Sequence, residues 1–169
     1  MNAQIKAIVE ALNLQPHPEG GFYKETYRSA GEINSVNLGD SYSGDRNYCT
    51  CIYFLLTSDN FSAFHRIKQD EIWHFYDGAT ISLHTISPAG DYKHILIGKD
   101  LQNGEVPQYI VPGGHWFAAE IEDEDTYTLV GCTVSPGFDF QDFELISRQD
   151  MVAMFPQHES IITKLTHKG

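Results

Sequence analysis

The stretch from Phe64 to Gly78, FHRIKQDEIWHFYDG, gathers the residue types best suited to chemistry. His65 and His74 flank Glu71, and a histidine near a carboxylate occurs both in metal sites and in general acid–base pairs. The same residues can equally form a hydrogen-bonded pair with a purely structural role, because buried polar groups are normally paired. The elements that position this stretch decide between these interpretations.

Residues 3–13 have apolar side chains at helical spacing and predict a short helix. Short runs rich in β-branched and aromatic residues follow, each bounded by Gly, Pro, Asn or Asp, which is typical of strands. The predicted strands are 22–29, 48–57, 60–66, 71–78, 80–86, 93–98, 107–121 and 126–134. The segment 29–47 predicts a long connection or a loose hairpin, SPAGDY at 87–92 a tight hairpin, and 142–166 a strand end with one or two helices. We therefore expect a mainly β sandwich or barrel, forming a single domain over 1–169 with short helices at both ends.

Alternate residues of a strand face the same side, so Glu71, Trp73 and Phe75 are expected to point inward together. Ile72, His74 and Tyr76 then point outward. The same alternation places Phe61, Ala63 and His65 on one face of the predicted strand 60–66. It also places His115 and Phe117 together on one face of the predicted strand 107–121. These assignments predict an apolar cavity with His65, Glu71 and His115 as its polar groups, which is the usual form of a small-molecule site.

The net charge of −12 opposes binding to nucleic acid and to anionic membranes, because both carry negative charge. Cys49, Cys51 and Cys132 are odd in number, so at least one thiol is unpaired, as suits a reducing compartment. The amphipathic N-terminal segment does not have the pattern of a signal peptide, and no apolar run is long enough to span a membrane. We expect a cytoplasmic protein.

FHRIKQDEIWHFYDG and QYIVPGGHWFAAE resemble the two conserved motifs of the cupin superfamily of jelly-roll proteins. A cupin-like family of small bacterial and fungal proteins of unknown function is more similar still, and that resemblance extends from His17 to Leu145. Four motifs carry it: HPEGGFYKETYRS, FHRIKQDEIWHFY, VPGGHW and LVGCTVSPGFDFQDFEL. It implies a double-stranded β-helix, or jelly-roll barrel. Because cupins are commonly dimers, and because exposed sheet edges often pair, we also expect a homodimer.

The resemblance bears on metal binding, because a typical cupin metal site uses three histidines and one glutamate. His65 and Glu71 match the first motif, but Ile67 and Phe117 occupy two of the histidine positions. We therefore expect no cofactor, with a divalent metal held by His65, Glu71 and His115 as the alternative.

Some metal-free cupins are sugar-nucleotide epimerases whose base is a histidine of the first motif, and His65 matches that position. The resemblance thus implies a metal-independent isomerase or epimerase of a sugar or small carbonyl compound, with Glu71 in support of His65. Tyr23, Tyr109 and Tyr127 are candidates for the opposing acid, and Asp139, Asp142 and Glu144 for orienting the histidine. The expected ligand-binding residues are Trp73, Phe75, His115, Phe117, Glu25 and Arg66. A binding protein without turnover remains the alternative to an enzyme.

Overall fold

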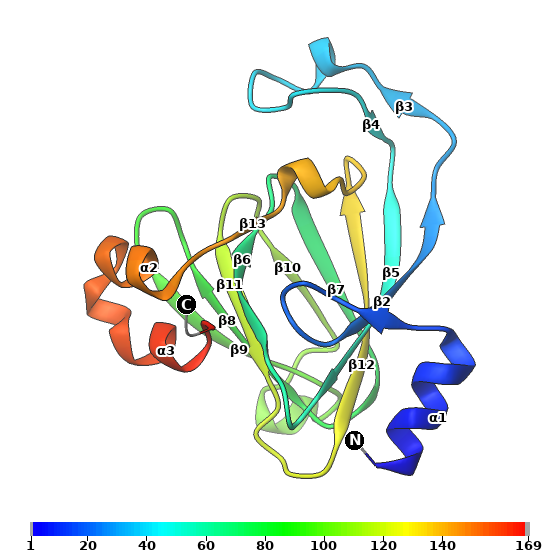
Figure 1. The fold of residues 1–169 in the computed structure, drawn as a ribbon, viewed down its shortest axis with the longest axis vertical. Coiled ribbons are helices and arrows are strands. Elements are labelled where there is room, and N and C mark those ends of the chain that lie inside the picture. Colours follow the sequence, from blue (N-terminus) through cyan, green and yellow to red (C-terminus); the bar gives the residue numbers. More distant parts are fainter. Residues whose placement is uncertain (1, 168–169) are drawn as a thin grey trace.

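Two β-sheets pack face to face in the computed structural model, which describes residues 2–167 (Figure 1). The first sheet has the strand order β1-β2-β5-β12-β7-β10 and the second the order β13-β6-β11-β8-β9. Within the described residues no backbone pairing closes the two sheets into one. The predicted mainly β jelly-roll fold with short helices near both ends is confirmed.

The strand bounds agree with most of the predicted runs. The six-stranded sheet contains β1 (Gln15–Pro16), β2 (Phe22–Arg28), β5 (Thr50–Thr57), β12 (Tyr127–Ser135), β7 (Asp70–Gly78) and β10 (Gln108–Val111). The five-stranded sheet contains β13 (Glu144–Leu145), β6 (Ser62–Arg66), β11 (Trp116–Glu120), β8 (Ile81–Ile86) and β9 (Tyr92–Ile97).

The single strand predicted over 107–121 is wrong, because this segment forms two strands in opposite sheets. β10 pairs with β7 in the first sheet, whereas β11 pairs with β6 and β8 in the second. The turn between them contains Gly114 at φ +78° and Gly113, where a Cβ would collide with the carbonyl of Lys68. The two glycines thus allow the chain to cross from one sheet to the other.

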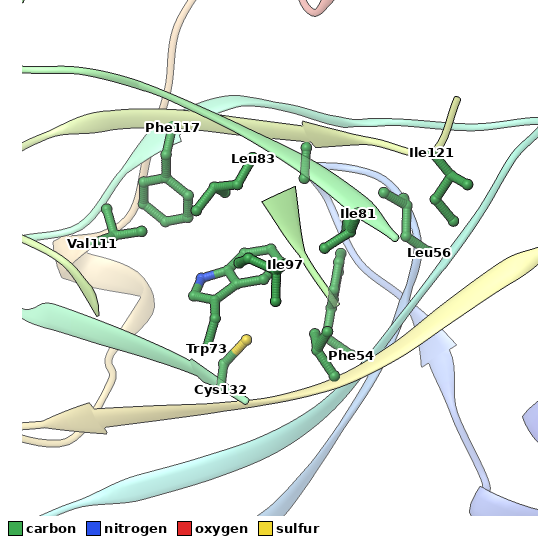
Figure 2. Close-up of a cluster of buried hydrophobic side chains, with 12 residues drawn as sticks. Phe54, Leu56, Trp73, Ile81, Leu83, Ile97, Val111, Phe117, Ile121 and Cys132 are labelled. Atoms are coloured by element: carbon green, nitrogen blue, oxygen red, sulfur yellow. The ribbon is translucent and has the colours of Figure 1, made fainter. Parts of the chain in front are cut away.

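Apolar side chains from both sheets fill the space between them. Figure 2 shows Trp73 of β7 and Cys132 of β12 pointing toward Leu83 of β8 and Phe117 of β11. A second cluster lies on the other side of the five-stranded sheet, beneath α2 (Arg148–Met154) and α3 (Glu159–Lys164), and a third beneath α1 (Ala3–Leu12). None of the helices within the described residues has the length and hydrophobicity of a membrane-crossing segment.

β6 contains a bulge that changes the predicted alternation of its side chains. Phe117 pairs with His65 but Ala119 pairs with Ser62, so β6 uses one residue more than β11 over this interval. Phe61 consequently packs against the cluster beneath α2 and α3, and does not share the inward face expected from its spacing to His65. The bulge brings the side chains of Ser62 and His65 to the same partner, as described below.

A buried ion pair fastens two long connections to the sandwich. The first is a hairpin arm formed by β3 (Glu32–Ile33) and β4 (Arg46–Asn47), which extends beyond the sheets in Figure 1. The second is the loop 136–143 with its 3₁₀ turn Phe140–Asp142. Arg46 donates to both carboxylate oxygens of Asp142 at 2.7 and 2.8 Å, and Gln69 donates to Asp142 and to the Gly137 carbonyl. The 29–47 segment is therefore the loose hairpin that was one of the two expectations.

This pair yields a stability prediction. Replacing Arg46 by Met leaves the buried Asp142 carboxylate with only the part-exposed Lys68 ammonium, 3.4 Å from its Oδ1, and we expect the free energy of unfolding to fall by about 3 kcal/mol. Glu144→Gln is the matched control, because it breaks the exposed Arg66–Glu144 pair and should cost less than about 1 kcal/mol. Urea unfolding of both variants measures the difference, and equal losses would contradict the role given to Arg46.

Candidate functional site

A cavity of about 470 Å³ opens between the sheets at the end covered by the loop 136–143. Its walls are mainly aromatic and aliphatic, and they include Tyr23, Ile52, Phe54, Ile67, Trp73, Val134, Phe138, Phe140 and Phe143. Its ionisable groups are Glu19, Glu25, Glu71, Asp139, His17, His65, Arg28 and Cys132. This is the combination of apolar surface and convergent polar groups that small-molecule sites use.

His65 is held by protein atoms at both ring nitrogens. Its Nδ1 lies 2.7 Å from the Ala63 carbonyl oxygen, which can only accept, so this nitrogen carries a proton. Its Nε2 lies 2.9 Å from Glu19 Oε2. Burial alone would lower the pKa of His65, but the charge of Glu19 and these hydrogen bonds outweigh it and raise the pKa. His65 is therefore an imidazolium paired with the Glu19 carboxylate.

The HPEGG turn delivers Glu19 to this position. Gly20 has φ +114°, and a Cβ there would collide with the Phe61 carbonyl, so the turn depends on glycine. The Glu19 backbone carbonyl accepts from Ala63 N–H, and its Oε1 accepts from the Ser62 hydroxyl at 2.8 Å. Burial opposes ionisation of Glu19, but the charge and hydrogen bond of His65 prevail and lower its pKa. The β6 bulge is what lets Ser62 and His65 reach one carboxylate.

His17, in the same turn, is the neutral neighbour of this pair. Its Nδ1 lies 3.3 Å from the Glu19 backbone nitrogen and 3.3 Å from Glu19 Oε2. Burial is the main cause of its lowered pKa, which the nearby Glu19 charge only partly offsets. The ring also makes an edge contact with Tyr23, 4.6 Å between centroids, so it forms part of the aromatic wall.

Glu71 is a buried carboxyl in the cavity wall, and no cation among the described residues forms an ion pair with it. Burial and the charge of Glu19 raise its pKa from 4.5 to about 7, against a smaller opposing effect of His65. The Cys132 thiol and the Trp73 indole lie beside it and also oppose the rise. The buried Trp73 Nε1–H makes no hydrogen bond of ordinary geometry among the described residues. Glu71 is thus the cavity group poised to change its protonation near neutral pH.

The expected alternative of a metal held by His65, Glu71 and His115 does not fit these residues. Both His65 nitrogens are engaged, and Ile67 lines the cavity where a further ligand would be needed. His115 lies in the β10–β11 turn and is not among the cavity residues. Within residues 2–167 no group of three or more His, Cys, Asp or Glu side chains is arranged to hold a metal ion.

Of the remaining predicted ligand-binding residues, Trp73 and Glu25 line the cavity. Phe117 lies behind the site, with its ring centroid 4.1 Å from that of His65, and Phe75 packs against the inner core. Arg66 lies outside the cavity, where it pairs with Glu144 and its guanidinium stacks 4.4 Å from the centre of the Trp116 ring. His115, Phe117, Phe75 and Arg66 are therefore not positioned as cavity contacts.

The structure also separates the candidates for assisting groups. Among the three tyrosines, Tyr23 lines the cavity, whereas Tyr127 donates to Asp77 near α1 and Tyr109 packs against the inner core. None of the three acidic residues expected to orient His65 contacts it. Asp139 lines the cavity, Asp142 pairs with Arg46, and Glu144 pairs with Arg66.

Sequence reasoning missed the main partner of His65. It expected Glu71 to support His65 and assigned no role to Glu19. A carboxylate followed by two glycines before a strand was the only local signal for Glu19, because it lies 46 positions before His65. The aromatic residues of the loop 136–143 were visible in SPGFDF, but their place over the cavity depends on Arg46, far away in the sequence.

Comparison with known proteins supports the same family. Residues 6–146 match the family described as "Cupin superfamily (DUF985)". The uncharacterized protein YML079W of Saccharomyces cerevisiae is 32% identical over 157 residues, covering 88% of this chain and 78% of the yeast protein. Protein SO0799 from Shewanella oneidensis has a structure with a TM-score of 0.88 and 38% identity, covering 100% of this chain and 99% of that one.

Two further structures define how far the likeness reaches. A hypothetical protein from Leishmania major has a TM-score of 0.88 and 34% identity, over 99% of this chain and 100% of that chain. Oxalate decarboxylase from Bacillus subtilis has a TM-score of 0.55 at 13% identity, over 91% of this chain and 37% of that chain, so it shares the fold alone. The relatives with substantial identity have no assigned activity in their names. The chain belongs to the DUF985 family of the cupin superfamily.

Proposed function

We propose that the cavity catalyses a metal-independent proton transfer on a small carbonyl compound, as an isomerase or epimerase, and that Glu71 moves the proton. The observation that carries this proposal is a buried carboxyl without an ion-pair partner in the wall of an apolar cavity. A general acid–base group works best when its pKa lies near the operating pH, and burial gives Glu71 a pKa of about 7.

His65 takes a different role from the one expected. A general base needs a free lone pair, and both nitrogens of His65 are directed at Ala63 and Glu19. We assign His65 to positioning: it holds the Glu19 charge, and that charge is the second cause of the raised pKa of Glu71. The pair therefore tunes the acid–base group and does not itself accept the proton.

The chemistry follows from these positions. As a carboxylate, Glu71 removes a proton from the carbon next to a carbonyl, and the electron pair of that C–H bond moves to form an enolate. The Trp73 N–H, which lies beside Glu71 and makes no hydrogen bond of ordinary geometry among the described residues, is a donor for the enolate oxygen. Glu71 then returns the proton to the neighbouring carbon or oxygen in an isomerisation. In an epimerisation the Tyr23 hydroxyl, which also lines the cavity, supplies a proton from the other face.

Glu71 lowers the stability of the fold at neutral pH, which supports a functional reason for its presence. Below pH 4.5 the carboxyl is protonated in both the folded and unfolded chain and has no effect. As the pH rises from 4.5 to about 7, the unfolded chain releases this proton while the folded chain retains it, so stability falls. A shift of this size corresponds to about 3 kcal/mol. Strongly perturbed groups in cavities are typical of functional sites.

We further propose a homodimer formed through the outer face of the six-stranded sheet. Cross-strand pairing places Tyr27, Cys51, Thr133, Ile72 and Ile110 in one row across this face. The row contains no charged residue, and Tyr27 and Ile110 are 53% and 50% exposed. Because the chain carries a net charge of −12, a second copy is least repelled where carboxylates are absent. A two-fold axis that runs along this row brings each of its residues against the same residue of the second copy.

The stability of Glu71→Gln should depend on pH in a defined way. The amide cannot ionise, so at pH 8 we expect the variant to be more stable than the parent by up to about 3 kcal/mol. Near pH 4.5 the two proteins should unfold alike. Urea unfolding at both pH values measures the difference, and a gain of equal size at both would show that packing, not ionisation, is responsible.

Deuterium exchange tests the reaction. The protein is incubated in D₂O with a panel of free aldoses, ketoses and cyclic ketones, and deuterium at the carbon next to the carbonyl is followed by NMR. We expect exchange above the buffer rate, and a loss of at least about 100-fold in Glu71→Gln. Glu144→Gln removes an exposed carboxylate outside the cavity and should exchange like the parent.

Three results would contradict this function in different ways. Undiminished exchange in Glu71→Gln would remove Glu71 from the reaction. Exchange that stops with a chelator and returns with a divalent ion would require a metal. Saturable binding of a panel compound without any exchange would make the cavity a binding site only.

The dimer predicts the effect of a charge placed within its interface. Ile110→Glu places a carboxylate opposite its own symmetry mate, so we expect sedimentation to show a monomer where the parent is a dimer. Leu101→Glu adds the same charge at a 66% exposed position elsewhere and should leave the dimer intact. A monomeric parent, or a dimer unaffected by Ile110→Glu, would contradict the assignment of this face.

A further inference from the structure

We infer that the cavity selects flat, ring-bearing ligands that are uncharged or positively charged, and that it rejects carboxylates and phosphates. This inference rests on the proposal that the cavity is the ligand site, and it names the class of compound that enters.

Both cations of the cavity are already occupied. Arg28 forms a bidentate pair with Glu25 at 2.9 and 2.7 Å, and it also donates to Asn47 and to the Phe138 carbonyl. Four hydrogen bonds thus engage a side chain that has five N–H groups. His65 is engaged by Glu19 and Ala63. An incoming anion would have to displace a carboxylate from one of these cations.

The carboxyls outnumber the cations. Glu71 and Asp139 line the cavity in addition to Glu19 and Glu25, and none of the described cations forms an ion pair with either of them. The site is therefore negative even while Glu71 is protonated, and more negative when it ionises. In an apolar cavity this charge acts at low dielectric, so it repels an anion more strongly than the same charge would in water. The net charge of −12 on the chain acts in the same direction.

The walls favour a flat ring. Phe54, Trp73, Phe138, Phe140 and Phe143 present aromatic surface to the cavity, and Phe140 is half exposed at its mouth. Figure 2 shows the Trp73 nitrogen on the edge of its ring that faces away from Ile81, and this buried N–H lies beside Glu71 without a hydrogen bond of ordinary geometry to any described residue. It is a donor for one acceptor atom on the ligand, such as a carbonyl oxygen. Aromatic faces also attract cations, which extends the preference to amines and amidines.

An isosteric series separates charge from shape. Benzamide, benzamidine and benzoate share one ring and nearly one outline but are neutral, cationic and anionic, and phenyl phosphate adds a second negative charge. Binding at pH 8 is followed by the indole N–H signals in nitrogen-15 NMR. The chain has two tryptophans, and Trp116 lies outside the cavity, so its signal is an internal control.

We expect benzamide and benzamidine to shift the Trp73 signal saturably while the Trp116 signal stays in place. Benzoate should bind at least about tenfold more weakly than benzamidine, and phenyl phosphate should not bind. Glu25→Gln frees the Arg28 guanidinium and should strengthen benzoate binding, whereas Glu144→Gln, outside the cavity, should change nothing.

Benzoate or phenyl phosphate binding as tightly as benzamidine would overturn the inference, and so would a Trp73 signal that none of the four compounds moves. Neither result depends on the role of Glu71. An anion preference combined with Glu71-dependent deuterium exchange would leave the proposed reaction standing and change only its substrate class.

Discussion

The burial of one ion pair organises the functional end of this protein. Glu19 and His65 are both almost fully removed from solvent, and charges in such a position are tolerated only when each is paired and hydrogen-bonded. The glycine turn at 20–21 brings Glu19 to the sheet, the β6 bulge turns Ser62 toward it, and the Ala63 carbonyl fixes the second nitrogen of His65. Each of these local irregularities would weaken a strand or a turn on its own, and together they satisfy one buried carboxylate.

The same pair explains why a familiar fold lacks its familiar ligand set. A histidine that ligates a metal needs a free nitrogen, and in this chain His65 Nε2 lies 2.9 Å from Glu19 Oε2. Phe117 packs against the ring of His65, and Ile67 lines the cavity. Phe117 and Ile67 exclude water from the Glu19–His65 ion pair, and the lower dielectric strengthens the Coulomb attraction between the two charges. The apolar residues and the ion pair are thus consistent with each other.

Local patterns were sufficient for the strands, the flanking helices and the hairpin at 87–92, because alternation and turn residues act over a few positions. They failed where the structure depends on distant partners. The run 107–121 looked continuous, but the PGGH turn divides it between two sheets. Strand alternation predicted that the side chains of His115 and Phe117 point into the cavity. His115 instead lies in that turn, and Phe117 lies behind His65. Glu71 was recognised as a site residue, but it was expected to support His65. Nothing in the local sequence indicated that Glu19 is the partner of His65, so the lack of an ion-pair partner for Glu71 could not be predicted.

Glu71 is the consequence of this arrangement that bears most on function. Because His65 is paired with Glu19, its positive charge stabilises the Glu71 carboxylate only weakly, while burial and the negative charge of Glu19 both discourage ionisation of Glu71. A sequence selected only for stability would favour an apolar side chain at this position, next to Trp73 and Cys132. The chain instead has an acid in an aromatic cavity wall, and the protonation of this acid changes near pH 7. This arrangement is expected of a site that transfers a proton to or from its ligand. The excess of carboxyl groups over cations in the cavity also repels anionic ligands. The same negative charge therefore influences both the protonation of Glu71 and the class of ligand that can bind next to it.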